Sequence, residues 1–330
     1  TLARKFQAAN PTNPEMMDLL GRSQLANSDP QGALDSYSKL VNMLPKSALA
    51  QMRLAQVQGI LKNDTGAAES LKKANALEPS MLPARVAQVE VATRRGRHDE
   101  ALALTRQLQQ DVPGSPVGFL LEGDLQLAQK NPALAMAAYD KAFAITKSGA
   151  VLLRSAQVQR QMGKAAEANA RVAQWAKAHP EDLSVAMYMA ESHLAAKEYK
   201  SASAILEDIV KRAPGNGAAL NNLAWAYQQQ KDPRALATAE EAFKVAGSNP
   251  AVMDTLGWML VEQGNTQRGL PLLQKAAAAP ASTPEMRYHL AVALHKSGDK
   301  TAARKELETL LAQNKPFDQL EEARSLLKTL

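Results

Sequence analysis

The sequence predicts an all-α superhelical solenoid of about nine helix-turn-helix units in a row, closed by a C-terminal capping helix. Prolines recur at a step of 34 residues from Pro45 to Pro79 and Pro113, and a near-34 step continues to Pro180 and Pro214. Small residues occupy two fixed points of each unit, and apolar residues between them recur at helical spacing. A fixed period of this length is typical of a repeat array, so the period decides the fold class.

Small residues recur where the two helices of each unit are expected to cross. With Pro14 as position 1 of the first copy, position 8 reads Gly21, Ala55, Val89, Gly123, Ala156, Ala190, Ala224, Gly257 and Ala291. Position 20 reads Ala33, Ala67, Ala101, Ala135, Ala168, Ala202, Ala235, Gly269 and Ala303, with one residue deleted in the turn of the seventh copy. A side chain larger than a methyl would push paired helices apart. Each copy is therefore predicted to be a helical hairpin, with Val89 a mild departure.

Turn residues separate the two helices of each copy. Glycine, which adopts a left-handed conformation without strain, is expected to end the first helix at Gly96, Gly163, Gly264 and Gly298. Asp or Thr, such as Asp99 and Thr266, is expected to cap the second helix. Asn131-Pro132 and Asp232-Pro233 are expected to act as an N-cap followed by proline at the first helical position.

The repeats set the domain organisation. The nine copies are placed at about 14–47, 48–81, 82–115, 116–148, 149–182, 183–216, 217–249, 250–283 and 284–317. Residues 1–13 are interpreted as the remnant of a preceding repeat, and 318–330 as an amphipathic capping helix. Length alone would suggest two domains, but the unbroken period favours one elongated array.

The repeat resembles a known family. The small positions, the closing prolines and the aromatics Tyr37, Tyr139, Tyr199 and Tyr227 are similar to the tetratricopeptide repeat (TPR), which shares the period and the helix-turn-helix unit. The resemblance covers nearly the whole chain. It implies that first helices line a concave groove, and that positions 2, 5, 9, 12 and 13 of each copy point into it.

Composition and motif spacing argue against catalysis and against nucleic-acid binding. The chain has no cysteine, which excludes disulfides and thiolate chemistry, and none of its five histidines pairs with another at the spacing of two metal ligands on one helix face. The net charge of +6 is modest, and its densest cluster, Arg94, Arg95, Arg97 and His98, is interpreted as a solvated turn. We therefore predict no catalytic residue, no metal and no cofactor.

The C-terminal part of the groove is the predicted binding site. Groove positions in copies two and four are mostly apolar, whereas copies seven to nine offer aromatic and polar side chains. The predicted ligand-binding residues are Asn221, Trp225, Gln228, Asp254, Trp258, Glu262, Tyr288 and His295. Trp225 and Trp258 share position 9, so they either anchor a partner or fill the space between neighbouring first helices. Trp175 is interpreted as a core residue of a second helix.

A narrower resemblance covers residues 217–330. The segments from Asn221 to Tyr227, from Asn249 to Trp258 and from Tyr288 to Leu294 resemble the TPR-repeat lipoproteins of the PEP-CTERM and exosortase system. This resemblance implies an exported bacterial cell-envelope protein, periplasmic and held by an N-terminal lipid anchor. It also implies a non-enzymatic scaffold in exopolysaccharide biosynthesis or export, which binds protein components of that machinery or the polysaccharide itself.

Two other functions remain open. One is a cytosolic adaptor that captures peptide tails, although Asp254 and Glu262 would repel a carboxylate. The other is the regulatory arm of a larger enzyme such as a glycosyltransferase. The sequence contains no stretch apolar enough for a membrane span.

Overall fold

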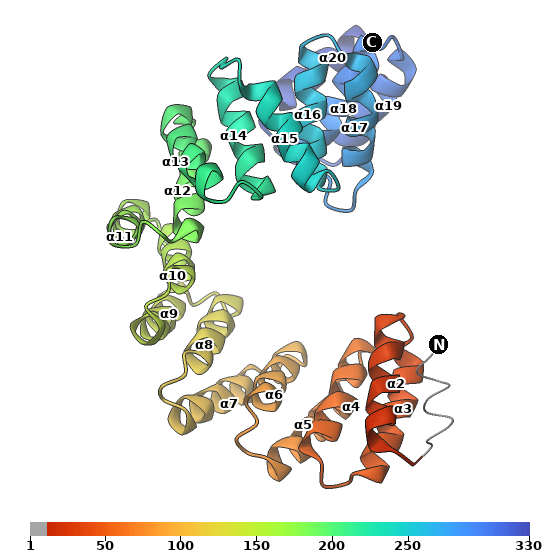
Figure 1. The fold of residues 1–330 in the computed structure, drawn as a ribbon, viewed down its shortest axis with the longest axis vertical. Coiled ribbons are helices and arrows are strands. Elements are labelled where there is room, and N and C mark those ends of the chain that lie inside the picture. Colours follow the sequence, from red (N-terminus) through yellow and green to blue (C-terminus); the bar gives the residue numbers. More distant parts are fainter. Residues whose placement is uncertain (1–11) are drawn as a thin grey trace. The chain divides into compact units, whose positions relative to one another are not determined.

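A computed structural model of the protein describes residues 12–330, and helices are its only regular elements over that range (Figure 1). Nineteen helices follow one another there, which confirms the predicted all-α fold of repeated hairpins. The chain forms two compact units, one ending at Asn169 and the other comprising Ala170–Leu330. The predicted repeat remnant at 1–13 falls mostly on residues 1–11, which lie outside the described residues.

First and second helices alternate in the first unit. The first helices are α2 (Pro14–Ala26), α4 (Ala48–Ile60), α6 (Leu82–Arg94), α8 (Val117–Ala128) and α10 (Gly149–Gln161). The second helices are α3 (Pro30–Met43), α5 (Asp64–Leu77), α7 (His98–Asp111) and α9 (Pro132–Thr146), and α11 (Ala165–Ala178) spans the boundary between the units. From α2 to α10, each helix packs against the next one along the chain.

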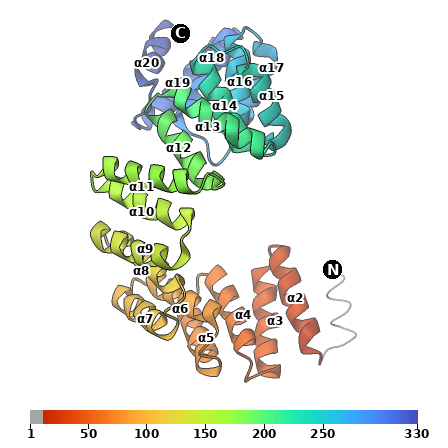
Figure 2. The ribbon, with the colours of Figure 1, turned by 60° about the vertical axis from the view of Figure 1, so that its left-hand side comes forward.

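The second unit continues the alternation and ends in a single helix (Figure 2). Its first helices are α12 (Leu183–Ala195), α14 (Gly217–Gln229), α16 (Pro250–Glu262) and α18 (Pro284–Lys296). Its second helices are α13 (Tyr199–Arg212), α15 (Ala235–Ala246), α17 (Thr266–Ala278) and α19 (Lys300–Ala312), and α20 (Leu320–Thr329) packs on α19. Here the first helices also contact one another, α12 with α14, α14 with α16 and α16 with α18.

The small positions lie in the core, and the glycines among them face large neighbours. A Cβ on Gly21 would lie 2.5 Å from the Tyr37 ring, and a Cβ on Gly123 would overlap the Tyr139 ring. Both tyrosines occupy position 24, so the glycine leaves room for an aromatic ring on the second helix. At Gly269 the close neighbour is backbone, because a Cβ there would lie 2.5 Å from the carbonyl oxygen of Gly257.

The turn inside each hairpin uses one left-handed residue, but glycine supplies it in only four copies. Gly96, Gly163, Gly264 and Gly298 have φ between 71° and 91°, as the sequence predicts. The equivalent residues of the other copies are Ser28, Lys62, Lys130, Lys197 and Lys231, with φ between 56° and 61°. A side chain in this region is strained, since Cβ approaches the following carbonyl oxygen. These five turns therefore hold a conformation that glycine would adopt more easily.

We expect Lys130→Gly to stabilise the protein. Relief of the left-handed strain outweighs the extra entropy of glycine in the unfolded chain, so the free energy of unfolding should rise by roughly 0.5–1 kcal/mol. Urea denaturation followed by circular dichroism measures the change. The matched control is Gln129→Gly, one residue earlier at φ −85°, which should lower stability. Equal effects of the two variants would contradict the strain at Lys130.

Several helix caps differ from those predicted. Asp99 and Thr266 lie inside the first turns of α7 and α17, and Asn265 caps α17 by accepting a hydrogen bond from the Arg268 N–H at 3.3 Å. The prediction for Asp232-Pro233 was wrong, because α15 begins at Ala235 and Asp232 instead binds the backbone and guanidinium of Arg234.

Asn131 and Trp175 also differ from expectation. Asn131 stands at the N-cap of α9 without capping it, because its side chain donates to the Gln126 amide oxygen at 3.1 Å. Trp175 is half-buried rather than in the core. Its indole stacks on His179 with ring centroids 3.9 Å apart, and its N–H donates to Asp182 at 2.9 Å.

Candidate functional site

The eight predicted binding residues lie on three successive first helices of the second unit that contact one another. Helix α14 contributes Asn221, Trp225 and Gln228, helix α16 contributes Asp254, Trp258 and Glu262, and helix α18 contributes Tyr288 and His295. We call these eight residues the C-terminal face. The fold therefore brings together residues up to 74 positions apart in the sequence.

Polar contacts link the three helices across this face. The Gln228 amide donates a hydrogen bond to the Glu262 carboxylate and so joins α14 to α16. The Lys296 ammonium reaches the Val261 carbonyl oxygen at 3.4 Å and joins α18 to α16. Glu262 itself is exposed. These links hold neighbouring first helices in register at the surface.

Asp254 is the least accessible of the eight residues to a ligand, because its carboxylate is buried and hydrogen-bonded within the protein. It is 8% exposed, and its carboxylate accepts from the Nδ1 atom of His289, which is 5% exposed, at 2.9 and 3.0 Å. His289 is not among the predicted binding residues. A signal was present, since the two residues are 35 positions apart, one more than the repeat period, which places them side by side on neighbouring first helices.

Trp258 packs against this pair. Its ring stacks on the His289 imidazole, with centroids 4.2 Å apart and planes 18° apart, and it joins the hydrophobic cluster around Val261. Tyr288 lies 6.5 Å from Trp258 and 6.3 Å from Phe317, measured between ring centroids. Burial raises the pKa of Tyr288, and the nearby Glu322 carboxylate raises it further. One face of Trp258 is thus covered by the protein itself.

Trp225 has a different environment. It is half-buried and lies outside the hydrophobic cluster that contains its neighbours Leu223 and Tyr227. Within residues 12–330, no aromatic ring and no hydrogen-bonding group partners its indole. Of the two tryptophans at position 9, Trp225 therefore has more of its surface free to contact a ligand.

Three polar atoms of the C-terminal face are buried without a partner among the described residues. They are Asn221 Oδ1, Gln228 Oε1 and His295 Nδ1. An unsatisfied buried polar group costs about 1–3 kcal/mol, so most such groups in folded proteins are paired. Other described residues, such as Asn75 and Gln319, have such atoms too, and on α14 and α18 they leave hydrogen-bonding capacity that a change of rotamer would present to a ligand.

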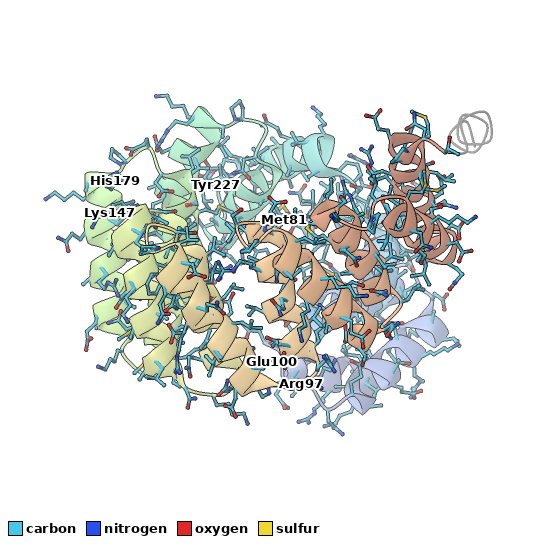
Figure 3. All side chains as sticks on the ribbon, turned by 90° about the horizontal axis from the view of Figure 1, so that it is seen from below. Met81, Arg97, Glu100, Lys147, His179 and Tyr227 are labelled. Atoms are coloured by element: carbon cyan, nitrogen blue, oxygen red, sulfur yellow. The ribbon has the colours of Figure 1, made fainter. Side chains whose placement is uncertain are left out.

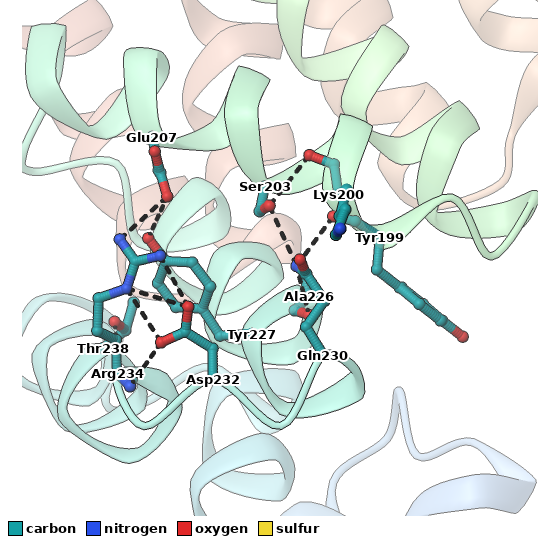
Figure 4. Close-up of polar contacts among 10 residues, drawn as sticks. All are labelled: Tyr199, Lys200, Ser203, Glu207, Ala226, Tyr227, Gln230, Asp232, Arg234 and Thr238. Carbon is teal, nitrogen blue, oxygen red and sulfur yellow. Dashed lines mark hydrogen bonds and ion pairs between the residues drawn. The ribbon is translucent and has the colours of Figure 1, made fainter.

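A polar network behind α14 fixes the helix that bears Trp225 (Figure 4). The Tyr227 hydroxyl donates to Glu207 of α13 at 2.7 Å, and the Arg234 guanidinium stacks 4.1 Å from the Tyr227 ring centroid while pairing with Glu207 at 3.1 Å. Burial raises the pKa of Tyr227, and the hydrogen bond to Glu207 raises it further. The Gln230 amide donates to Ser203 at 3.1 Å. Helix α14 is therefore held to α13 by satisfied contacts.

Two of the four basic residues of the turn in the first unit form ion pairs. Arg94 binds Asp64 at 2.8 Å, and Arg97 binds Glu100 at 3.3 Å. Figure 3 shows Arg97 and Glu100 at the end of α6 opposite Met81. This pairing lowers the local positive charge, in line with the interpretation of the cluster as a solvated turn.

Several cavities of the described residues lie away from the C-terminal face, and two of them are the following. One of about 450 Å³ lies between the first helices α4 and α6, with Met52, Ala55 and Val91 among its lining. The other, of about 470 Å³, is lined by Phe243 of α15 and Leu272 of α17. Among the described residues, no group of three or more His, Asp or Glu side chains could hold a metal ion. None of the helices described combines the length and the apolar character needed to cross a bilayer.

Comparisons with known proteins agree with the repeat pattern. The tetratricopeptide repeat family matches residues 19–81, 153–216, 189–250 and 255–319. Cellulose synthase operon protein C of Xanthomonas axonopodis pv. citri (strain 306) is 31% identical over 248 residues, or 72% of this chain, and the chain spans only 16% of that protein.

Solved structures share the fold at low sequence identity. The Cut9–Hcn1 hetero-tetramer of APC/C has a TM-score of 0.57 at 16% identity, with 92% of this chain and 59% of the other covered. The human IFIT1 dimer with PPP-AAAA has a TM-score of 0.54 at 13% identity, with 96% and 81% covered. These similarities concern the arrangement of helices alone.

Proposed function

This chain belongs to the tetratricopeptide repeat family, and we propose that it is a non-enzymatic scaffold that binds a protein segment through its C-terminal face. The observation that supports this site is that Asn221 and Gln228, each with an unpartnered buried oxygen, lie one helical turn from the half-buried indole of Trp225 on α14. An extended segment supplies backbone donors and acceptors for the polar atoms, and an apolar side chain for the indole.

We place this scaffold in bacterial exopolysaccharide biosynthesis or export, in association with the PEP-CTERM and exosortase system. Two observations support the context. The matched relative is named for the cellulose synthase operon, and the segments from Asn221 to Tyr227 and from Asn249 to Trp258 resemble the repeat lipoproteins of that system. The proposed location is the periplasmic side of the cell envelope, with a lipid anchor outside this sequence.

Site-specific photo-crosslinking in native cells tests this function. Benzoylphenylalanine replaces the exposed Gln229 on α14, and the control site is the exposed Lys305 on the second helix α19. We expect protein adducts from the Gln229 site and none from the control site. The adducts should be recovered from the envelope fraction and identified as proteins of exopolysaccharide biosynthesis or export. Adducts with cytosolic proteins only would contradict the envelope function, and adducts with polysaccharide only would contradict a protein ligand.

We expect Trp225→Ala to weaken binding of the crosslinked partner at least tenfold without lowering the melting temperature. Loss of an anchoring tryptophan typically costs about 2 kcal/mol of binding free energy, and Trp225 lies outside the hydrophobic cluster that contains Leu223 and Tyr227, so this cluster loses no contact. Isothermal titration calorimetry and thermal circular dichroism measure the two effects.

Trp258→Ala is the matched comparison, because its ring stacks on His289. It should lower the melting temperature whatever it does to binding. A loss of stability in Trp225→Ala equal to that in Trp258→Ala, with partner affinity unchanged, would assign both tryptophans to packing.

A further inference from the structure

A preformed pocket opens on the second-helix side of the C-terminal repeats. It has a volume of about 470 Å³, with Leu256 and Leu260 of α16 at its base and Phe243, Pro271 and Leu272 on its walls. Leu256 and Leu260 are nearly fully buried, so the base of the pocket is the hydrophobic core between α15 and α17.

This pocket and the C-terminal face lie on different sides of α16. Leu256 is two residues from Asp254 and two from Trp258, and two residues correspond to about 200° around a helix. A ligand in the pocket would therefore contact α15, α17 and one side of α16, whereas the proposed protein segment contacts α14, α18 and the other side of α16. The pocket is a separate surface from the one proposed above.

Pro271 leaves one backbone acceptor of α17 without its helical partner. It lies inside α17 and has no N–H, so the carbonyl of Gln267, four residues earlier, does not receive the usual helical hydrogen bond. Gln267 and Pro271 both line the pocket. An apolar pocket with one open carbonyl suits a peptide residue that buries its side chain and donates its N–H.

The charges at the rim favour an acidic partner. Arg268 of α17 is already paired with Glu240 of α15 at 3.0 Å. Lys244 lies one helical turn after Glu240, is exposed, and has no ion-pair partner within residues 12–330. With two cations and one carboxylate, the lining has an excess positive charge at Lys244, which attracts a carboxylate next to the buried side chain.

We propose that this pocket, defined by Phe243, Leu256, Leu260, Pro271 and Leu272, docks an acidic peptide segment of a protein partner. A large apolar side chain of the segment fills the pocket, its backbone N–H donates to the Gln267 carbonyl, and an adjacent carboxylate pairs with Lys244. The protein thereby has two docking surfaces, one on first helices and one on second helices, and can hold two partners at once.

Methyl NMR of the full chain tests the pocket directly. The probe is a hexapeptide with phenylalanine between two glutamates, and the matched probe has lysines in place of the glutamates. We expect saturable shifts of the Leu256, Leu260 and Leu272 methyl groups with the acidic probe, and at least fivefold weaker binding of the basic one. Shifts that do not saturate, that occur elsewhere, or that are equal for both probes would overturn the proposal.

Two charge variants separate the rim from general electrostatics. Lys244→Glu should weaken the acidic probe at least tenfold, whereas Lys275→Glu, an equal charge change on α17 outside the lining, should leave its affinity nearly unchanged. If both variants lost the same affinity for the acidic probe, the binding would depend on net charge alone, and the proposed site would be overturned. Both residues are exposed, so neither variant should unfold the protein.

Pro271→Ala distinguishes the open carbonyl from a purely structural proline. The new N–H closes the helical hydrogen bond to Gln267, so the melting temperature should rise while affinity for the acidic probe falls several-fold. A rise in melting temperature with unchanged affinity would show that the Gln267 carbonyl does not bind the peptide. None of these measurements involves the C-terminal face, so failure here and failure of the crosslinking at Gln229 are independent results.

Discussion

Gly269→Leu is expected to lower the free energy of unfolding by about 3 kcal/mol, near the upper end of the usual cost of overpacking. A Cβ at this position would lie 2.5 Å from the Gly257 carbonyl oxygen and about as close to Val261. Because the nearest atom is backbone, a rotamer change cannot relieve the overlap, and α16 and α17 must move apart. Urea denaturation followed by circular dichroism measures the loss.

Gly215→Leu is the control for this prediction. Gly215 lies in an exposed loop, and nothing lies within 4 Å of the position a Cβ would take. Its substitution should change stability by less than about 0.5 kcal/mol. Similar losses in both variants would mean that leucine itself, and not the helix crossing, destabilises the chain.

Asp254→Ala is expected to cost about 3 kcal/mol of folding free energy, since it leaves the buried Nδ1 donor of His289 without an acceptor. The stacked Trp258 ring would also lose support, so its near-ultraviolet circular dichroism signal should weaken. Thermal and chemical denaturation measure the loss.

Asp254→Asn tests the same contact more gently. An amide oxygen in place of the carboxylate still accepts from His289, so we expect a cost of about 1 kcal/mol. If Asp254→Ala proved as stable as Asp254→Asn, the hydrogen bond to His289 would contribute nothing to folding. Asp254 would then be free to act as a ligand-binding carboxylate.

The helix crossings could be predicted from the sequence, because positions 8 and 20 recur with the repeat. Which copies need glycine at position 8 could not be predicted, since that depends on how the residue at position 24 packs. Tyr37 and Tyr139 lie over Gly21 and Gly123, and this contact appears only when the two helices are packed.

Lysine in left-handed turns was missed for a related reason. Lysine has no preference for that conformation, and at Lys130 the surrounding hairpin imposes it.

The placement of the candidate residues on neighbouring first helices was predictable, but their contacts were only partly so. Repeat numbering placed Trp225 and Trp258 on neighbouring first helices. It gave them equal roles, whereas the His289 ring covers Trp258 alone. His289 was compared only with other histidines, so its pairing with Asp254 was not considered. The pocket beside Pro271 was missed because it combines residues of α15, α16 and α17, and no single helix displays that pattern.

The nearest-neighbour packing of these helices has a consequence for folding speed. Within each unit, the helices that pack together either follow one another in sequence or are separated by one other helix. Contact order is therefore low, and little loop-closure entropy opposes the formation of each hairpin. A 34-residue hairpin leaves the ribosome in about 2–7 s at typical synthesis rates. Helical hairpins form far faster than that, so the chain is expected to fold repeat by repeat as it is made.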